Sequence, residues 1–302
     1  MQKIQPSLWF SENNSEEAMK FYTSVFPEGK IVHIDYYPSG YTEGPLAGME
    51  GKIINGVFTL SGTEFLALDG GPGVFEFNPS ISFFVNCKSV DEVKSYYEKL
   101  VEGGSVLMPL NKYPFSEQYA WISDKFGISW QITVGQGSSL LSPSFLFVGD
   151  RVGKVEEAVN FYVDVFSKAG ESKINMISRY EEGEDKGKIN YCSFEMAGQT
   201  FSAMESSMDH KFVMDNNAIS FTINCQDQEE VDYYWEKLSF VKEAEQCGWV
   251  KDRYGVSWQI VPKALLETVG GSDPAGKKRA MDAMMGMKKL DVQGLWDAYN
   301  GK

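Results

Sequence analysis

Three blocks of this sequence occur twice in the same order, and this duplication restricts the fold more than any other feature. Ile81–Leu100 matches Ile219–Leu238 at eleven of twenty positions, and GISWQI at 127–132 returns as GVSWQI at 255–260. A third pair, EEAMKFYTSVF and EEAVNFYVDVF, lies near the start of each copy. Repeats of this kind indicate one structural unit used twice. We therefore predict two tandem modules, residues 1–137 and 138–262, followed by an extension at 263–302.

Each copy shows the same alternation of strand-like and helix-like spacing. A short strand precedes a helix whose apolar residues recur every three or four positions, and three strand-like runs follow. A second unit then begins with ISFFVNC or ISFTINC and continues into a helix, for which Ser89 and Asp227 are the expected N-caps. The order is βαβββ in each unit, with four units in the chain. After Pro262 helical spacing predicts a helical extension.

Composition excludes several classes of protein. The formal charge of -14 opposes binding to nucleic-acid phosphates and favours solubility. No apolar stretch is long enough for a membrane span, and the N-terminus lacks a signal-peptide core, so we expect a cytoplasmic protein. Four well-separated cysteines fit reduced thiols better than a disulfide framework.

Several segments resemble one known superfamily over nearly the whole chain. They are MQKIQPSLWF, AISFTINCQDQEEVDYYWEKL, QCGWVKDRYGVSWQIVP and the tail DPAGKKRAMDAMMGMKKLDVQGL. These segments resemble the vicinal-oxygen-chelate superfamily of glyoxalase I, bleomycin-resistance proteins and extradiol dioxygenases. Within it they resemble the PhnB-like branch, which is often labelled 3-demethylubiquinone-9 3-methyltransferase. The resemblance implies an α+β fold with two cupped mixed sheets, and a dimer-like pair of modules in one chain. A homodimer of the whole chain is left open.

The same resemblance allows a test for a metal centre. Metal-dependent relatives take ligands, mostly His and Glu, from the first strand, the strand that opens the second unit and the last strand. Motif alignment places six residues at these positions: Gln5, Ser80 and Gln131 in the first copy, and Ser142, Ala218 and Gln259 in the second. Amide and hydroxyl oxygens are poor partners for a transition metal. We therefore predict no metal and no other cofactor.

Strand alternation predicts a polar face opposite an apolar one. Trp130 and Trp258 should pack under the helices as core anchors, which points Gln131 and Gln259 to the other side. Each glutamine is then either a buried amide that holds neighbouring backbone or part of a floor that binds a small ligand. The candidate ligand-binding residues on this reasoning are Gln5, Trp9, Ser80, Ser82, Gln131, Ser144, Ser220, Thr222 and Gln259.

The first hypothesis for function is a metal-free protein that binds a small organic molecule, and the acidic balance would suit a cationic one. The alternative is an enzyme that uses non-standard metal ligands or acid-base residues, with Glu12, Glu64, Glu195 and Asp124 as carboxylates of unknown placement. Methyl transfer, as in the family label, is disfavoured because no glycine-rich nucleotide loop joins a strand to a helix. A third hypothesis is a scaffold whose C-terminal helix binds a partner protein. Whether the chain is an enzyme is left open.

Overall fold

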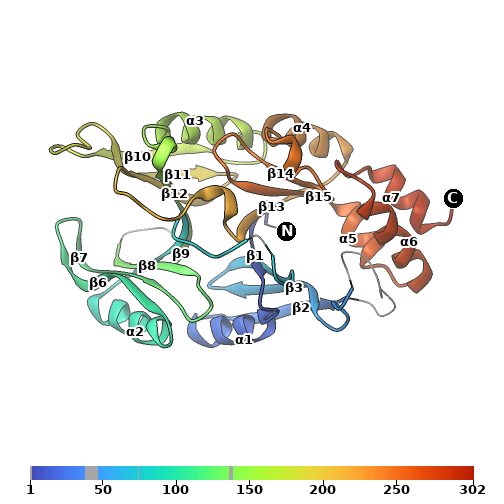
Figure 1. Ribbon diagram of the computed structural model, residues 1–302, viewed down its shortest axis with the longest axis horizontal. Helices are drawn as coiled ribbons and strands as arrows, with labels where there is room; N and C mark the ends of the chain where they lie inside the picture. The colour runs from blue at the N-terminus through green and yellow to red at the C-terminus, as the bar shows by residue number, and fades with distance from the viewer. Residues whose placement is uncertain (1, 38–46, 74, 136–138) are drawn as a thin grey trace. The chain divides into compact units, whose positions relative to one another are not determined.

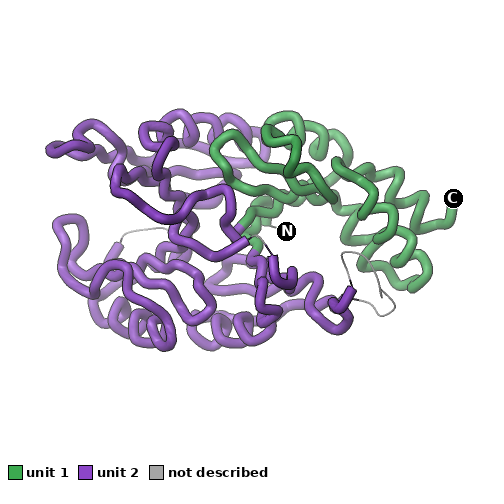
Figure 2. The backbone as a smooth tube through the Cα atoms, viewed as in Figure 1, with its two compact units in different colours: residues 1–7, 220–302 green, residues 8–219 purple. Residues whose placement is uncertain are grey.

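The computed structural model describes residues 2–37, 47–73, 75–135 and 139–302 (Figure 1). The chain divides into two compact units (Figure 2). Unit 1 contains residues 1–7 and 220–302, and unit 2 contains residues 8–219. No helix in the described part of the chain is both long and apolar enough to cross a membrane.

Unit 2 contains a complete eight-stranded mixed sheet. In hydrogen-bonded order its strands are β10 (Lys173–Arg179), β11 (Ile189–Met196), β12 (Gln199–Ser206), β9 (Leu141–Val148), β5 (Ile81–Cys87), β8 (Ser129–Val134), β7 (Ser116–Ser123) and β6 (Ser105–Tyr113). The pairs β12–β9 and β5–β8 are parallel, and β5–β9 is antiparallel. Four strands come from the second half of the first repeat, and the other four come from the first half of the second repeat. The sheet therefore joins the two copies.

One face of this sheet is apolar and lies under helices. Helix α2 (Val90–Val101) packs on β6, β7 and β8, and helix α3 (Val155–Phe166) packs on β10, β11 and β12. The Trp130 and Phe145 side chains lie on this face and are almost completely buried. The phenol ring of Tyr162 on α3 is 5.9 Å from the ring of Phe145. The predicted direction of the apolar side chains is confirmed.

The other sheet has seven strands, and the division between the units passes through its strand β1. In hydrogen-bonded order the strands are β14 (Trp249–Lys251), β15 (Ser257–Pro262), β13 (Ile219–Cys225), β1 (Ile4–Phe10), β4 (Thr63–Asp69), β3 (Ile53–Leu60) and β2 (Lys30–Tyr36). In unit 2, helix α1 (Ser15–Val25) packs on β3 and β4. This sheet also combines halves of both copies. The two mixed sheets confirm the predicted fold class.

The two repeats differ just before their last two strands. The spacing between the copies falls from 138 residues, at Ile81 and Ile219, to 128 residues, at Gly127 and Gly255. The second copy has therefore lost about ten residues where the first copy forms β6. In unit 1 the described residues between α4 (Gln228–Leu238) and β14 form a short 3-10 turn and an isolated bridge from Gln246 to Trp249, but no full strand. The last unit therefore has one strand fewer than the βαβββ pattern predicted.

The C-terminal extension covers the edge that this shortening leaves. It forms helices α5 (Lys263–Val269), α6 (Pro274–Met285) and α7 (Val292–Tyr299). The backbone N–H groups of Cys247 and Gly248 donate to the carbonyls of Met287 and Lys288, at 2.9 and 2.8 Å. Leu290 is fully buried in the same unit. In the aligned sequences Cys247 and Gly248 correspond to two β7 residues, and β6 is the strand that pairs with β7. The extension thus packs on its own chain.

Candidate functional site

The repeated WQI strand begins in a turn that is held by a buried aspartate. In the first copy Asp124 is 3% exposed, and its Oδ2 atom accepts hydrogen bonds from Trp130 Nε1 and the Tyr22 hydroxyl, both at 2.7 Å. Its Oδ1 atom accepts from the backbone N–H groups of Phe126 and Ile128. Burial raises the pKa of Asp124 despite these four donors. Asp124 is thus a structural anchor for the tryptophan.

The second copy repeats this turn. Asp252 accepts from Trp258 Nε1 at 2.8 Å and from two backbone N–H groups of its own turn. Gly127 and Gly255 have φ of +94° and +89°, a left-handed conformation that glycine adopts without steric strain. The recurrence of the hexapeptide therefore has a structural cause. The glycine closes the turn, the tryptophan anchors one face, and the glutamine is left on the other.

Gln131 connects side chains of three neighbouring strands on that other face. Its Nε2 atom donates to Ser82 Oγ on β5 at 2.9 Å, and its Oε1 atom accepts from the Tyr119 hydroxyl on β7 at 2.7 Å. All three side chains are almost completely buried. Burial also raises the pKa of Tyr119, so its phenol stays protonated and acts as a donor. Both of these hydrogen bonds join the Gln131 amide to other side chains rather than to backbone groups.

Three serines lie directly across from one another on the same face, and we call Ser82, Ser144 and Ser202 the serine row. Ser82 on β5 is the register partner of Ser144 on β9, and Ser144 is the partner of Ser202 on β12. Their exposed fractions are 1%, 0% and 2%. The hydroxyls of Ser144 and Ser202 have no hydrogen-bond partner within the described part of the chain. Within the described residues, two buried hydroxyls therefore have no partner, on the two strands that follow the Ser82 strand in the sheet.

The four central strands carry no charged side chain on the face of the serine row, and the carboxylate nearest to it in register is Glu195 on β11, which accepts from the Thr200 hydroxyl. The side chains on this face of the four central strands β12, β9, β5 and β8 are polar but neutral, or apolar. Phe84 contacts Tyr191 of β11 edge-on, with ring centroids 5.9 Å apart. Glu205, on β12, belongs to the opposite face, where its carboxylate accepts from the backbone N–H groups of Ile189 and Gly153. The row is thus a neutral polar patch flanked by apolar and aromatic side chains.

In unit 1 the corresponding residues bond one another. Gln259 Nε2 donates to Ser7 Oγ and to Ser220 Oγ, both at 3.0 Å. Asn224 Nδ2 donates to Gln5 Oε1 at 2.8 Å. The buried hydroxyl of Thr222 has no partner within the described residues. Aligned repeats match Ser7 with Ser144, so the same serine is bonded in unit 1 and has no partner among the described residues in unit 2.

Two further candidate residues have other surroundings. Ser80 Oγ donates to Asn78 Oδ1 at 2.6 Å and accepts from Asn217 Nδ2 at 3.0 Å, so it belongs to a buried asparagine cluster. Trp9 lies against Gly70, where an added Cβ would come within 1.8 Å of the indole ring. Its ring also meets that of Phe75, with centroids 5.6 Å apart. Ser80 lies two residues before Ser82, next to the serine row, but its hydroxyl is already bonded to the asparagines. Trp9 belongs to β1 of the other sheet.

The chain matches one protein family twice. A model of the family described as 3-demethylubiquinone-9 3-methyltransferase matches residues 2–133 and again residues 140–261. The chain belongs to this family. A PhnB protein from Bacillus cereus is 43% identical and is covered completely, over 44% of this chain, with a TM-score of 0.40. No curated protein matches.

Solved structures outside this family share its fold. A glyoxalase I variant from Zea mays is 11% identical, with 86% of this chain and 94% of that chain covered and a TM-score of 0.53. At this identity the likeness concerns the fold alone. The family member described here therefore has a glyoxalase-like, vicinal-oxygen-chelate fold, as its repeats and motifs predicted. The tandem duplication agrees with the two matches to the family model.

The residues at the metal-ligand positions of this fold do not fit a transition metal. Each sheet combines positions from both copies. Ser142 lies in the same sheet as Gln131, and Gln5 lies in the same sheet as Gln259. Both glutamine amides already bond neighbouring side chains. Within the described ranges, no three His, Cys, Asp or Glu side chains are grouped so that they could hold an ion. Neutral oxygens with other partners are weak ligands.

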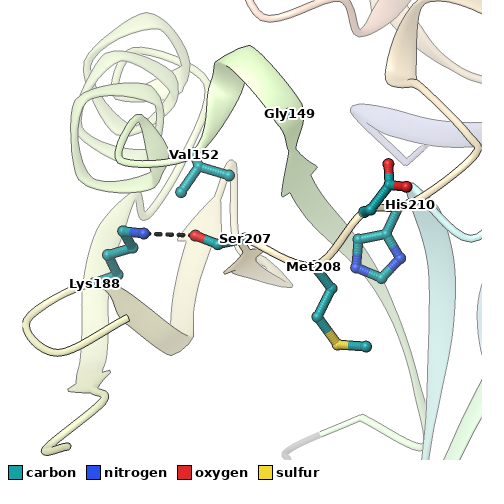
Figure 3. A pocket seen from close by; sticks show the side chains of 7 residues that line it. Gly149, Val152, Lys188, Ser207, Met208 and His210 are labelled. Atoms are coloured by element: carbon teal, nitrogen blue, oxygen red, sulfur yellow. Dashed lines mark hydrogen bonds between the residues drawn. The ribbon is translucent and has the colours of Figure 1, made fainter. Parts of the chain in front are cut away.

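One open pocket lies elsewhere in unit 2, with a volume of about 450 Å³ (Figure 3). It is lined by Gly149, Val152, Lys188, Ser207, Met208, Asp209 and His210. The ammonium of Lys188 points at the Ser207 hydroxyl and also pairs with Asp185 at 2.7 Å. Burial lowers the pKa of His210, which lies on the loop after β12. None of the candidate residues lines this pocket.

The structure adds two residues that the sequence did not single out. Ser202 completes the serine row, and Tyr119 holds Gln131. The alternation of QTFSAMES placed Ser202 on the same face as other small polar residues. Tyr119 stands two positions before Trp121 in a strand-like run, and this spacing puts both on one face. Both signals were present, but they depended on which strands would become neighbours.

Proposed function

We propose that this protein binds a small organic molecule at the serine row of the eight-stranded sheet, without a metal ion. The observation that carries the proposal is the pair of buried hydroxyls on Ser144 and Ser202, which have no partner within the described residues. A buried polar group without a partner destabilises a protein by about 1–3 kcal/mol. A ligand that supplies a donor or an acceptor would offset this penalty when it binds. Functional sites often retain such local instability.

The orientation of Gln131 supports the same proposal. Its amide is held from both sides by Ser82 and Tyr119, so the Ser82 hydroxyl keeps its own hydrogen free for another acceptor. A row of hydroxyls that can each donate or accept would suit a ligand oxygen. Small-ligand sites commonly combine a few placed polar groups with apolar walls, and Phe84, Leu146 and Met204 share this face.

Methyl transfer, the activity in the family description, is not part of this proposal. A glycine-rich loop that serves a nucleotide leads from a strand into a helix. Here the glycine-rich stretch after β4 leads to strand β5, and residues 70–73 and 75–80 contain no helix. Residue 74 lies outside the described part. Asp124, one of the carboxylates considered for acid-base chemistry, is committed to the turn beside Trp130.

The test begins with a thermal-shift screen of neutral, anionic and cationic compounds, followed by calorimetric titration of each hit. We expect the double variant Ser144→Ala/Ser202→Ala to bind hits about tenfold more weakly, because two hydrogen bonds of ordinary strength are lost. Thr222→Val is the matched control, since it removes a buried unpaired hydroxyl from unit 1. Equal affinity of the double variant and the wild type would overturn the proposal. Stoichiometric metal in protein purified without chelator, with melting that EDTA lowers, would overturn its metal-free part.

A further inference from the structure

An aromatic cluster stands at the end of the hairpin formed by β6 and β7. The ring centroids of Tyr113 and Phe115 are 5.5 Å apart in a stacked arrangement. Tyr119 meets both rings edge-on, at 5.6 Å from Tyr113 and 5.1 Å from Phe115. Phe115 is 67% exposed, whereas Tyr119 is 4% exposed. We call these three residues the aromatic tip.

The aromatic tip is connected directly to the serine row. Tyr119 contacts the exposed ring of Phe115 and donates its hydroxyl to Gln131, which in turn donates to Ser82. A single exposed aromatic side chain is ordinary on a protein surface. This one differs because its ring contacts lead, through one phenol and one amide, to Ser82. Ser82 is the register neighbour of Ser144, whose hydroxyl has no partner within the described residues. A continuous series of contacts therefore runs from the Phe115 ring through the Tyr119 phenol and the Gln131 amide to the serine row.

We infer that the ligand is an uncharged aromatic compound that carries a hydroxyl or carbonyl oxygen, and that the chain binds one such molecule. This inference rests on the proposed function. The ring would pack on the aromatic tip, where rings favour stacked or edge-on contacts. The oxygen would bond within the serine row. A charged ligand would lose its hydration against four central strands that offer it no opposite charge, which strongly disfavours its binding there.

A stoichiometry of one follows from the difference between the copies. The second copy lacks the residues that form β6, and Cys247 occupies the position of Tyr119. The Cys247 Sγ lies 4.0 Å from Met285 Sδ of the C-terminal extension. Gln259 already donates to both serines near it, Ser7 and Ser220. The described residues of unit 1 thus form no counterpart of the aromatic tip, and both serines next to Gln259 already accept a hydrogen bond.

The experiment titrates four probes into the full chain by calorimetry. They are 2-naphthol, its saturated analogue decahydro-2-naphthol, naphthalene-2-sulfonate and 2-naphthyltrimethylammonium. We expect 2-naphthol to bind at one site per chain, and the saturated alcohol to bind about fivefold more weakly. The two charged probes should bind more weakly still. Two equivalent sites, or tighter binding of either charged probe, would overturn the inference.

Two variants test the role of the tip. Phe115→Ala should weaken 2-naphthol about fivefold and leave the melting temperature unchanged, because the side chain is mostly exposed. Phe240→Ala is the matched control, since Phe240 is 63% exposed in the short segment that replaces β6 in the second copy. Equal effects of the two variants would contradict the role of the tip. Screen hits that depend on Ser144 but not on Phe115 would refute this inference alone, whereas hits that depend on neither would refute the proposed function itself.

Discussion

Replacing Ser144 by alanine should stabilise the protein, although most substitutions at buried positions destabilise. The Ser144 hydroxyl is fully buried and has no partner within the described residues. Removing an unsatisfied buried group eliminates a penalty of about 1–3 kcal/mol, and a methyl group leaves almost no cavity. We expect the free energy of unfolding to rise by about 1 kcal/mol. For a chain of this size that corresponds to roughly 2 °C in melting temperature.

The aligned serine of the first repeat provides a control with the opposite sign. Ser7 is also buried, but its hydroxyl accepts a hydrogen bond from Gln259 Nε2 at 3.0 Å. Ser7→Ala should therefore destabilise by about 1 kcal/mol, the usual net contribution of one hydrogen bond. The two serines lie in different compact units, so each variant is compared with wild type for the unfolding transition that it shifts.

The assay is equilibrium urea unfolding followed by tryptophan fluorescence, supported by calorimetric melting. Midpoints that shift without a change in slope report stability alone. A lower midpoint for Ser144→Ala would refute the reasoning, because it would show that the hydroxyl has a partner in solution. A higher midpoint combined with weaker binding of screen hits would have a specific meaning. It would show that the unpaired hydroxyl is retained for a ligand at the expense of stability.

Three further predictions concern the extension, the buried cysteines and the Asp124 anchor. Leu290→Ala should lower the free energy of unfolding by about 2–5 kcal/mol, as for other buried leucines. A change below about 0.5 kcal/mol in urea unfolding would mean that the extension does not pack on the rest of unit 1. Burial raises the pKa of Cys87, Cys192 and Cys225 to about 12, about 11 and about 12. A disulfide reagent near neutral pH should therefore label none of these three thiols in the native protein. Rapid labelling of the three would contradict their burial. Burial raises the pKa of Asp124 above its ordinary 3.8, so its contribution to stability is present at low pH and is lost as the pH rises past that value. Asp124→Asn should therefore lose less stability than wild type as the pH is raised, and urea midpoints that change in parallel would argue against this.

Local patterns in the sequence determined the elements and the faces of the strands. The duplication was visible as matched blocks, and Ser89 and Asp227 cap α2 and α4 as predicted, each accepting from a backbone N–H group three residues later. Trp130 packs toward the helices and Gln131 away from them, as alternation required. These features depend on residues that are neighbours in sequence, so periodicity and capping chemistry are enough to specify them.

Strand pairing between distant parts of the chain decided the candidate site. Each sheet contains strands of both copies. Gln131 therefore shares a sheet with Ser144 of the second repeat, whereas Gln5, from the same repeat as Gln131, shares a sheet with Gln259. No local period encodes that choice, because every strand carries a similar polar face. The sequence likewise contains the same serine at 7 and 144. Only the tertiary structure shows that Gln259 bonds Ser7, whereas Gln131 bonds Ser82 and Tyr119 and leaves Ser144 without a partner in the described part of the chain.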